Sequence, residues 1–297
     1  MTQPVFYDYV ATDYGEHEDA MREYRAAGTR RALELDNRGP LILTEAGRLH
    51  PDIVAAYERA GFYVFTGLLG AEELADIEAD VIAMWDNAPV AKGEAVDRQG
   101  RPALAVGCRA RTLSWVKPLS DPIGGTGASH GRHPAKMIEP SAPGAGPEHI
   151  LQLVLGSLQF SDACLRLYAH PDLLRVAATI LGDDFVPFNE AVWVKHPGLG
   201  GSVAWHQDGF THWDSPGLDQ HTHGFNFMAQ LYGCDAANGL WVVPGSQDIG
   251  RADIPSWVAE ARSDRLERAV PLLCDPGDVA ICNRKSEQLL SVSAPSG

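Results

Sequence analysis

Long apolar runs are missing from this sequence of 297 residues. No stretch of about 18 or more consecutive apolar side chains occurs, so the chain is not predicted to span a membrane. Its polar, acidic beginning also lacks a basic segment followed by an apolar one, the pattern of a secretory signal. No internal repeat and no long low-complexity tract is present, so nothing in the sequence indicates a repeat array.

Cysteine is scarce, and its spacing suggests no pairing. The five cysteines are scattered and odd in number, and no two form a Cys-x-x-Cys pair. The sequence therefore indicates neither a zinc knuckle nor a disulfide framework, and a reducing cytoplasm is the simplest compartment. Each cysteine is interpreted as a small buried apolar residue. The five are Cys108, Cys164, Cys234, Cys274 and Cys282.

Positive charge is in the minority. The chain has 24 lysine and arginine residues against 39 aspartate and glutamate residues, which gives a net charge of −15. This balance argues against nucleic acid or an anionic membrane as the main partner. A small organic molecule remains open as a substrate, because a local site can oppose the overall field. The sequence does not indicate an oligomeric state.

What is present is an ordinary globular composition, with 45% hydrophobic and 21% charged residues. Helical patterns dominate the first part of the chain, and short β-type runs separated by turn residues follow from about residue 185. This order predicts an α+β fold whose strands roll into a sandwich or barrel. The predicted helices are Glu16–Leu35, Pro51–Ala60, Ala71–Trp85, His149–Phe160 and Pro171–Leu181. The predicted late strands are Val186–Lys195, Val203–His206, Phe225–Tyr232, Leu240–Val243, Ala269–Leu273 and Val279–Cys282.

A long segment rich in Gly and Pro, residues 87–148, interrupts the helices. We expect it to form a lid or a substrate loop, because long loops in compact domains usually gate or bind. Two apolar runs within it, Ala103–Val106 and Leu113–Val116, are candidate strands. Before this segment, Phe62–Phe65 is predicted as a short strand.

The sharpest chemical feature is Trp205-His206-Gln207-Asp208. On a strand, side chains alternate with a period of two, so His206 and Asp208 share one face while Gln207 points to the other. An imidazole beside a carboxylate offers two ligands to a metal, and a third from another strand would complete a 2-His-1-carboxylate face. The tripeptide alone is weak, because an exposed Asp and a half-buried His near a turn give the same pattern.

Further segments strengthen the motif, because together and in this order they resemble the phytanoyl-CoA dioxygenase family. The resemblance covers about residues 55–284 and is most specific from 170 to 284. The matching segments are His170-Pro171-Asp172-Leu173-Leu174 through Gly182, Val192–Gly198, Trp205–Asp208, Asn238–Gln247 and Pro276-Gly277-Asp278-Val279.

The resemblance implies a double-stranded β-helix (a cupin-like jelly roll) with N-terminal helices packed outside. Residues 1–297 would form a single domain, with a helical layer over about 1–184, a jelly-roll core over about 185–284 and an atypical tail over 285–297. Activity would need Fe(II), 2-oxoglutarate and O2, and would oxidise a small organic metabolite while 2-oxoglutarate is converted to succinate and CO2.

The same resemblance assigns candidate site residues. His206 and Asp208 would be the first two iron ligands. Lys195 is a candidate contact for a 2-oxoglutarate carboxylate, and a solvated lysine before a turn explains it equally well. Gln207 and Trp205 are candidates beside the cofactor, although packing in the core is the alternative for both.

The chain departs from the family pattern at its end. Relatives carry a second histidine soon after the Gly-Asp-Val strand and an arginine about ten residues later, which binds 2-oxoglutarate. Here the expected position falls at about Ser286 to Leu290, no histidine follows His223, and Arg284 comes too early. Loss of the family's last strands would also leave a sheet edge uncovered.

Three interpretations of this departure remain open. The chain could be a truncated or frame-altered product of an oxygenase gene. It could be a non-catalytic relative that uses the fold as a binding module. Alternatively, His212, His221 or His223 could supply the missing ligand. A metal-dependent hydrolase using His206 and Asp208 is a further rival, which predicts activity without O2 or a 2-oxo acid.

Overall fold

The structure is a computed structural model that combines helices with three β-sheets. It describes residues 14–118, 147–196, 198–200, 203–208, 224–263, 265–284 and 286, and the backbone of 288–290. The helices are η1 (Gly15–His17), α1 (Glu18–Leu33), α2 (Pro51–Ala60), α3 (Ala71–Asp86), η2 (Ser157–Gln159), α4 (Asp162–Tyr168), α5 (Pro171–Leu181), η3 (Ser246–Ile249) and α6 (Ile254–Ala261). The strands are β1 (Arg38–Gly39), β2 (Phe62–Phe65), β3 (Leu113–Val116), β4 (Ile150–Leu155), β5 (Ala191–Trp193), β6 (Val203–His206), β7 (Phe225–Ala229), β8 (Leu240–Val242), β9 (Val270–Pro271), β10 (Val279–Asn283) and β11 (Gln288–Leu290).

Two helices begin in the same way, at a His-Pro-Asp sequence. His50 and His170 each accept a hydrogen bond, through Nδ1, from the backbone N–H of the aspartate two residues on. The proline then occupies the first helical turn, where its missing N–H costs nothing. The sequence prediction of α2 and α5 is therefore confirmed to the residue.

Two four-stranded sheets form the centre of the molecule. The first sheet has the strand order β1-β2-β10-β7, and the second has the order β6-β11-β8-β9. Between them lies a cluster of buried apolar side chains from both sheets. It includes Phe62, Val64, Ala280 and Cys282 from the first sheet and Leu240, Val242 and Val270 from the second.

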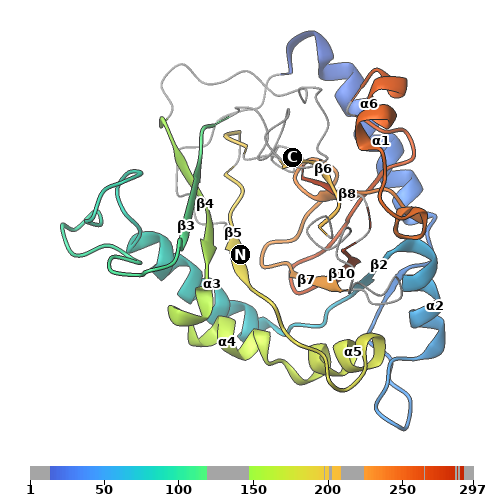
Figure 1. Cartoon of the computed structure of the whole chain (residues 1–297), viewed down its shortest axis with the longest axis horizontal. Coiled ribbons are helices and arrows are strands. Elements are labelled where there is room, and N and C mark those ends of the chain that lie inside the picture. The colour runs from blue at the N-terminus through green and yellow to red at the C-terminus, as the bar shows by residue number, and fades with distance from the viewer. Residues whose placement is uncertain are drawn as a thin grey trace.

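Helices cover the outer faces of both central sheets (Figure 1). On the first sheet, Phe65 and Ile281 pack with Tyr57 of α2 and Val176 of α5. On the second sheet, the apolar cluster includes Trp205, Trp241 and residues of α6. Helix α1 joins this side through Tyr24, whose ring stacks on Trp241 with centroids 4.5 Å apart.

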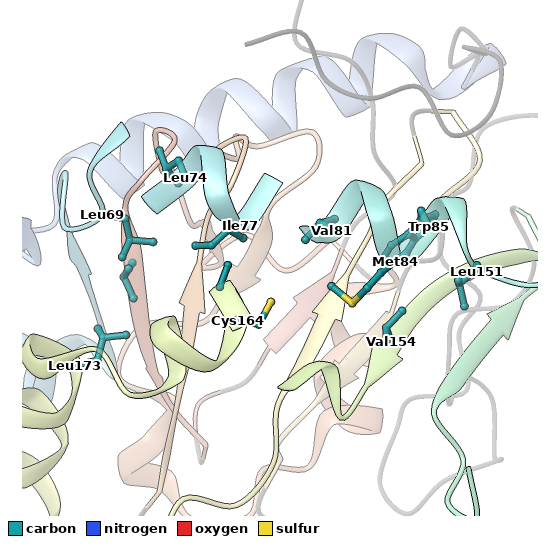
Figure 2. Packing of buried hydrophobic residues seen from close by; sticks show 13 residues of the cluster. Leu69, Leu74, Ile77, Val81, Met84, Trp85, Leu151, Val154, Cys164 and Leu173 are labelled. Atoms are coloured by element: carbon teal, nitrogen blue, oxygen red, sulfur yellow. The ribbon is translucent and has the colours of Figure 1, made fainter. Parts of the chain in front are cut away.

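The third sheet, with the order β3-β4-β5, packs against α3. Figure 2 shows one face of α3 directed at this sheet and at α4. Leu74, Ile77, Val81 and Met84 form the apolar stripe that the helical spacing predicts, and Trp85 extends it. Across from them lie Leu151 and Val154 of β4.

Two local predictions are wrong. His149–Phe160, predicted as a helix, contains strand β4 and the short η2. Because β4 is buried on both faces, its sequence is apolar except for Gln152 and lacks the alternation that marks a half-exposed strand. Ala103–Val106 is a turn, with Ala105 at a φ of 67°, whereas Leu113–Val116 is confirmed as strand β3.

The division into a helical first part and a β-rich second part also needs correction. Strands β1 to β4 fall before residue 184, and β2 pairs with β10 inside the first sheet. In addition, β11 lies within the tail from 285 and pairs with both β6 and β8. The expected lid is only partly described, since residues 119–146 lie outside the described residues.

Candidate metal site

Strand β6 ends at the histidine of the His-x-Asp motif. Nε2 of His206 lies 3.2 Å from Oδ1 of Asp208, and the two side chains are 16% and 29% exposed. The structure thus brings the imidazole and the carboxylate together, as alternation along a strand predicts.

The hydrogen bonds of His206 indicate which of its two ring nitrogens carries the hydrogen in the neutral ring. Its Nδ1 lies 2.8 Å from the carbonyl oxygen of Ala204, and a carbonyl can only accept, so Nδ1 carries a hydrogen. In the neutral ring, Nε2 then has a lone pair. Two acceptors 3.2 Å apart repel each other unless a cation lies between them, either a proton on Nε2 or a metal ion.

This spacing suits a metal ion. Ligand atoms at about 2.1 Å from a metal, in neighbouring octahedral positions, lie about 3 Å apart. The Nε2–Oδ1 distance of 3.2 Å is close to that value. A backbone carbonyl on the other ring nitrogen is also the usual support of a metal-binding histidine. His206 and Asp208 therefore fit two of the three protein ligands of such a site.

Asp208 is held on several sides. Asn226 of β7 donates from Nδ2 to Oδ2 of Asp208 at 2.7 Å. The backbone N–H of Asp208 donates to the carbonyl of Arg284 at 2.9 Å, and the Arg284 guanidinium donates to the Asp208 carbonyl at 3.3 Å. Burial alone would raise the pKa of Asp208, but His206, Asn226 and Arg284 together hold this pKa below its usual range. The carboxylate is thus kept ionised, as a metal ligand must be.

Gln207 and Trp205 lie on the opposite side of β6 from the His206–Asp208 pair. The Gln207 amide donates to the carbonyl of Gly250 at 2.9 Å and accepts from the N–H of Ala252 at 3.0 Å. Trp205 is fully buried in the cluster beside α6. Both side chains therefore fix β6 against the segment that leads into α6.

Lys195 follows β5 and is half-buried. Its Nζ donates to the carbonyl oxygen of Asn238 at 3.2 Å, which joins the end of β5 to the turn before β8. The ammonium group is thus engaged with backbone rather than simply solvated.

A third metal ligand is not found among the described residues, whose His, Cys, Asp and Glu side chains form no group of three suited to a metal. The backbone of β11 nevertheless places Gln288 directly opposite His206 on one side and Val242 on the other. This is the part of the chain where the family pattern led us to expect the second histidine. His212, His221 and His223 lie outside the described residues.

Two residues beside the site were not identified from sequence. Asn226 stands in the strand sequence Phe-Asn-Phe-Met-Ala, where one polar residue among apolar ones was the available signal. Cys282 is fully buried and pairs with Asn226 across the sheet. Burial, followed by the charge of Asp208, raises the pKa of Cys282, so its thiol stays protonated.

The fold and the pair of donors define a mixed helix-and-sheet protein with a His-x-Asp arrangement suited to a metal. A model of the phytanoyl-CoA dioxygenase (PhyH) family matches residues 57–285. The chain therefore belongs to this family of iron(II)- and 2-oxoglutarate-dependent oxygenases, as its motifs indicated. No curated protein matches the sequence.

Solved structures share the fold at low sequence identity. EctD from S. alaskensis, in its apoform, is 20% identical over 87% of this chain and 77% of its own, with a TM-score of 0.53. AviO1 from Streptomyces viridochromogenes is 18% identical over 86% of this chain and 91% of its own, with a TM-score of 0.51. EvdMO1 is also 18% identical, with a TM-score of 0.50, and this chain spans only 45% of its length.

Proposed function

We propose that this protein is an Fe(II)- and 2-oxoglutarate-dependent dioxygenase that hydroxylates or otherwise oxidises a small organic molecule. The observation that carries the proposal is the 3.2 Å approach of His206 Nε2 to Oδ1 of Asp208, with a backbone carbonyl on the other ring nitrogen of His206. Family membership supplies the identity of the metal and the co-substrate.

The two central sheets support a jelly roll as the scaffold of this site. From β6 onward the strands fall in the second, first, second, second, first and second sheet, with apolar side chains between the two sheets. Ala32 of α1 and Cys282 of β10 share that one core, which supports a single domain across the described chain. The acidic net charge remains consistent with a small molecule, rather than nucleic acid, as the partner.

In the proposed site, Nε2 of His206 and Oδ1 of Asp208 would hold the iron, while Asn226 fixes the Asp208 carboxylate and Arg284 fixes the Asp208 backbone carbonyl. When bound, iron and 2-oxoglutarate supply O2 activation coupled to decarboxylation of the oxo acid. Lys195 is the candidate partner for a carboxylate of 2-oxoglutarate, in which case its ammonium would exchange the Asn238 carbonyl for the co-substrate. Gln207 and Trp205 would act on the cofactor only through the position of β6.

A succinate assay tests the proposal. The protein is mixed with Fe(II) and 2-oxoglutarate without oxygen, and succinate is measured after O2 is admitted. We expect succinate from the wild type and none from His206→Ala. His50→Ala, which removes a helix N-cap away from the site, is the control and should retain activity. Equal succinate from the wild type and His206→Ala would refute the assignment.

A non-catalytic binding module is the second candidate, favoured by the lack of a third ligand among the described side chains. The Gln288→His variant separates the two. Directly opposite residues in an antiparallel pair have Cα atoms about 4.5–5.5 Å apart, so a histidine at 288 starts within reach of the site. If the wild type binds no Fe(II) and produces no succinate while this variant does both, the wild type is the binding module.

A further inference from the structure

Cys234 and Cys274 lie opposite each other in a part of the molecule that the proposed reaction does not use. They form an isolated antiparallel bridge, outside the named strands. Cys234 N–H donates to the Cys274 carbonyl at 2.8 Å, and Cys274 N–H donates to the Cys234 carbonyl at 2.9 Å. Each residue thus exchanges both backbone hydrogen bonds with the other.

Two glycines allow the backbone segments that carry the two cysteines to approach closely. Gly233 has a φ of 81°, and a Cβ added to it would lie 2.7 Å from the carbonyl oxygen of Cys274. On the other side, a Cβ on Gly239 would lie 2.8 Å from the carbonyl oxygen of Leu272 and 3.5 Å from Sγ of Cys234. Directly opposite residues of an antiparallel pair direct their side chains to the same face, so the two sulfur atoms lie in neighbouring positions.

The spacing of such a pair permits a disulfide, but the disulfide would be strained. Opposed residues that exchange both hydrogen bonds have Cα atoms about 5.5 Å apart, within the range that a disulfide spans. Their Cβ atoms are usually farther apart than the roughly 3.8 Å typical of a disulfide, so closure must twist the bridge. Strained disulfides are reduced more easily than structural ones.

The geometry points to Cys234 and Cys274 as a reversible dithiol–disulfide pair that is oxidised by peroxides. The half-buried Cys234 reacts first, because Cys274 is only 6% exposed. Its sulfur attacks a peroxide oxygen, the O–O bond breaks, and a sulfenic acid and water form. Sγ of Cys274 then attacks Sγ of Cys234, the S–O bond breaks, and the Cys274 proton leaves with the hydroxyl as water. In total, two thiols and one hydrogen peroxide give one disulfide and two waters.

The local environment keeps the reduced pair stable until an oxidant arrives. The hydrogen bond with the Cys234 thiol, and then burial, raise the pKa of Cys274, so its thiol stays protonated. The Cys234 thiol in turn donates to the carbonyl of Leu272 at 3.2 Å. This proposal does not depend on iron or 2-oxoglutarate.

Intact-mass spectrometry of the whole metal-free protein tests the pair. The reduced protein is treated with a small excess of hydrogen peroxide and quenched. One part is measured intact, and another part is digested without reductant so that cross-linked peptides can be identified. We expect a mass loss of two hydrogen atoms, a peptide joining 234 to 274, and full reversal by dithiothreitol. Cys234→Ser and Cys274→Ser should each abolish the cross-link, whereas Cys108→Ser, at an exposed cysteine, should retain it.

Other outcomes would overturn the inference. These are no loss of mass at peroxide levels that oxidise the exposed Cys108, a cross-link that includes Cys282 in place of either partner, or a bridge that survives in Cys234→Ser. Circular dichroism of the serine variants checks that the fold is kept. Succinate formation is measured separately, so a protein without oxygenase activity can still show the disulfide.

Discussion

The hydrogen bond from Asn226 to Asp208 is expected to set how strongly the site binds a divalent metal. At 2.7 Å, and with a charged acceptor, it belongs to the stronger class of hydrogen bonds. It engages Oδ2, so Oδ1 remains directed at His206. We therefore predict that Asn226→Ala frees the carboxylate to rotate and lowers metal affinity.

The size of this effect follows from two independent estimates. Loss of a residue that supports a metal ligand typically weakens metal binding by about 10–100-fold. A hydrogen bond to a charged group contributes about 1.5–3 kcal/mol, which corresponds to a similar range of affinity. We expect the dissociation constant for Co(II), used as an oxygen-stable probe, to rise by about 10–100-fold in Asn226→Ala.

The measurement is a Co(II) titration followed by visible absorption, with Asn37→Ala as the matched control. Asn37 is buried and, like Asn226, donates an amide hydrogen, here to the backbone carbonyl of Phe62 at 3.2 Å. The control should lose stability and keep its Co(II) affinity. Equal Co(II) affinities for Asn226→Ala and the wild type would refute the reasoning, as would an equal loss in Asn37→Ala.

Two further predictions concern stability. Gly28→Ala places a Cβ against the buried Trp241 ring, so overpacking should outweigh the gain in helix propensity and lower the free energy of unfolding in urea by about 1–3 kcal/mol. Ala26→Ser, at an exposed position of the same helix, is the control, and an equal change in both would contradict the prediction. Burial lowers the pKa of His196 to about 4, so the folded state favours the neutral ring. The contribution of neutral His196 to the free energy of unfolding is complete above the unfolded-state pKa of about 6.5. This contribution is lost as pH falls toward 4, which lowers the free energy of unfolding by about 3 kcal/mol. Urea unfolding between pH 7 and 4 should show a smaller decline for His196→Gln than for the wild type, and parallel declines would count against it.

The elements that sequence analysis predicted correctly are those specified by neighbours in the chain. Helices α2 and α5 carry their own caps, and α3 has an apolar stripe with helical spacing. Strand β6 and its His-x-Asp motif were predicted for the same reason, since alternation alone places His206 and Asp208 on one face.

The elements that were missed depend on distant partners. Strand β4 was predicted as a helix because a short buried apolar run has no distinguishing period. Helices α4 and α6 have only 7 and 8 residues, too short for a clear stripe. The contact of Asn226 with Asp208 could not be read from spacing, because β7 reaches β6 only through the arrangement of the two sheets.

The position of β11 has a consequence for the order in which the protein assembles. Within the described chain, β6 pairs only with β11, which comes after every other strand in the sequence. During synthesis, β6 therefore has no strand partner until residues 288–290 have been made. Pairing strands that are so far apart in the sequence is slow. We therefore expect the imidazole of His206 to reach its final position late in folding, so that metal uptake would report on completed folding.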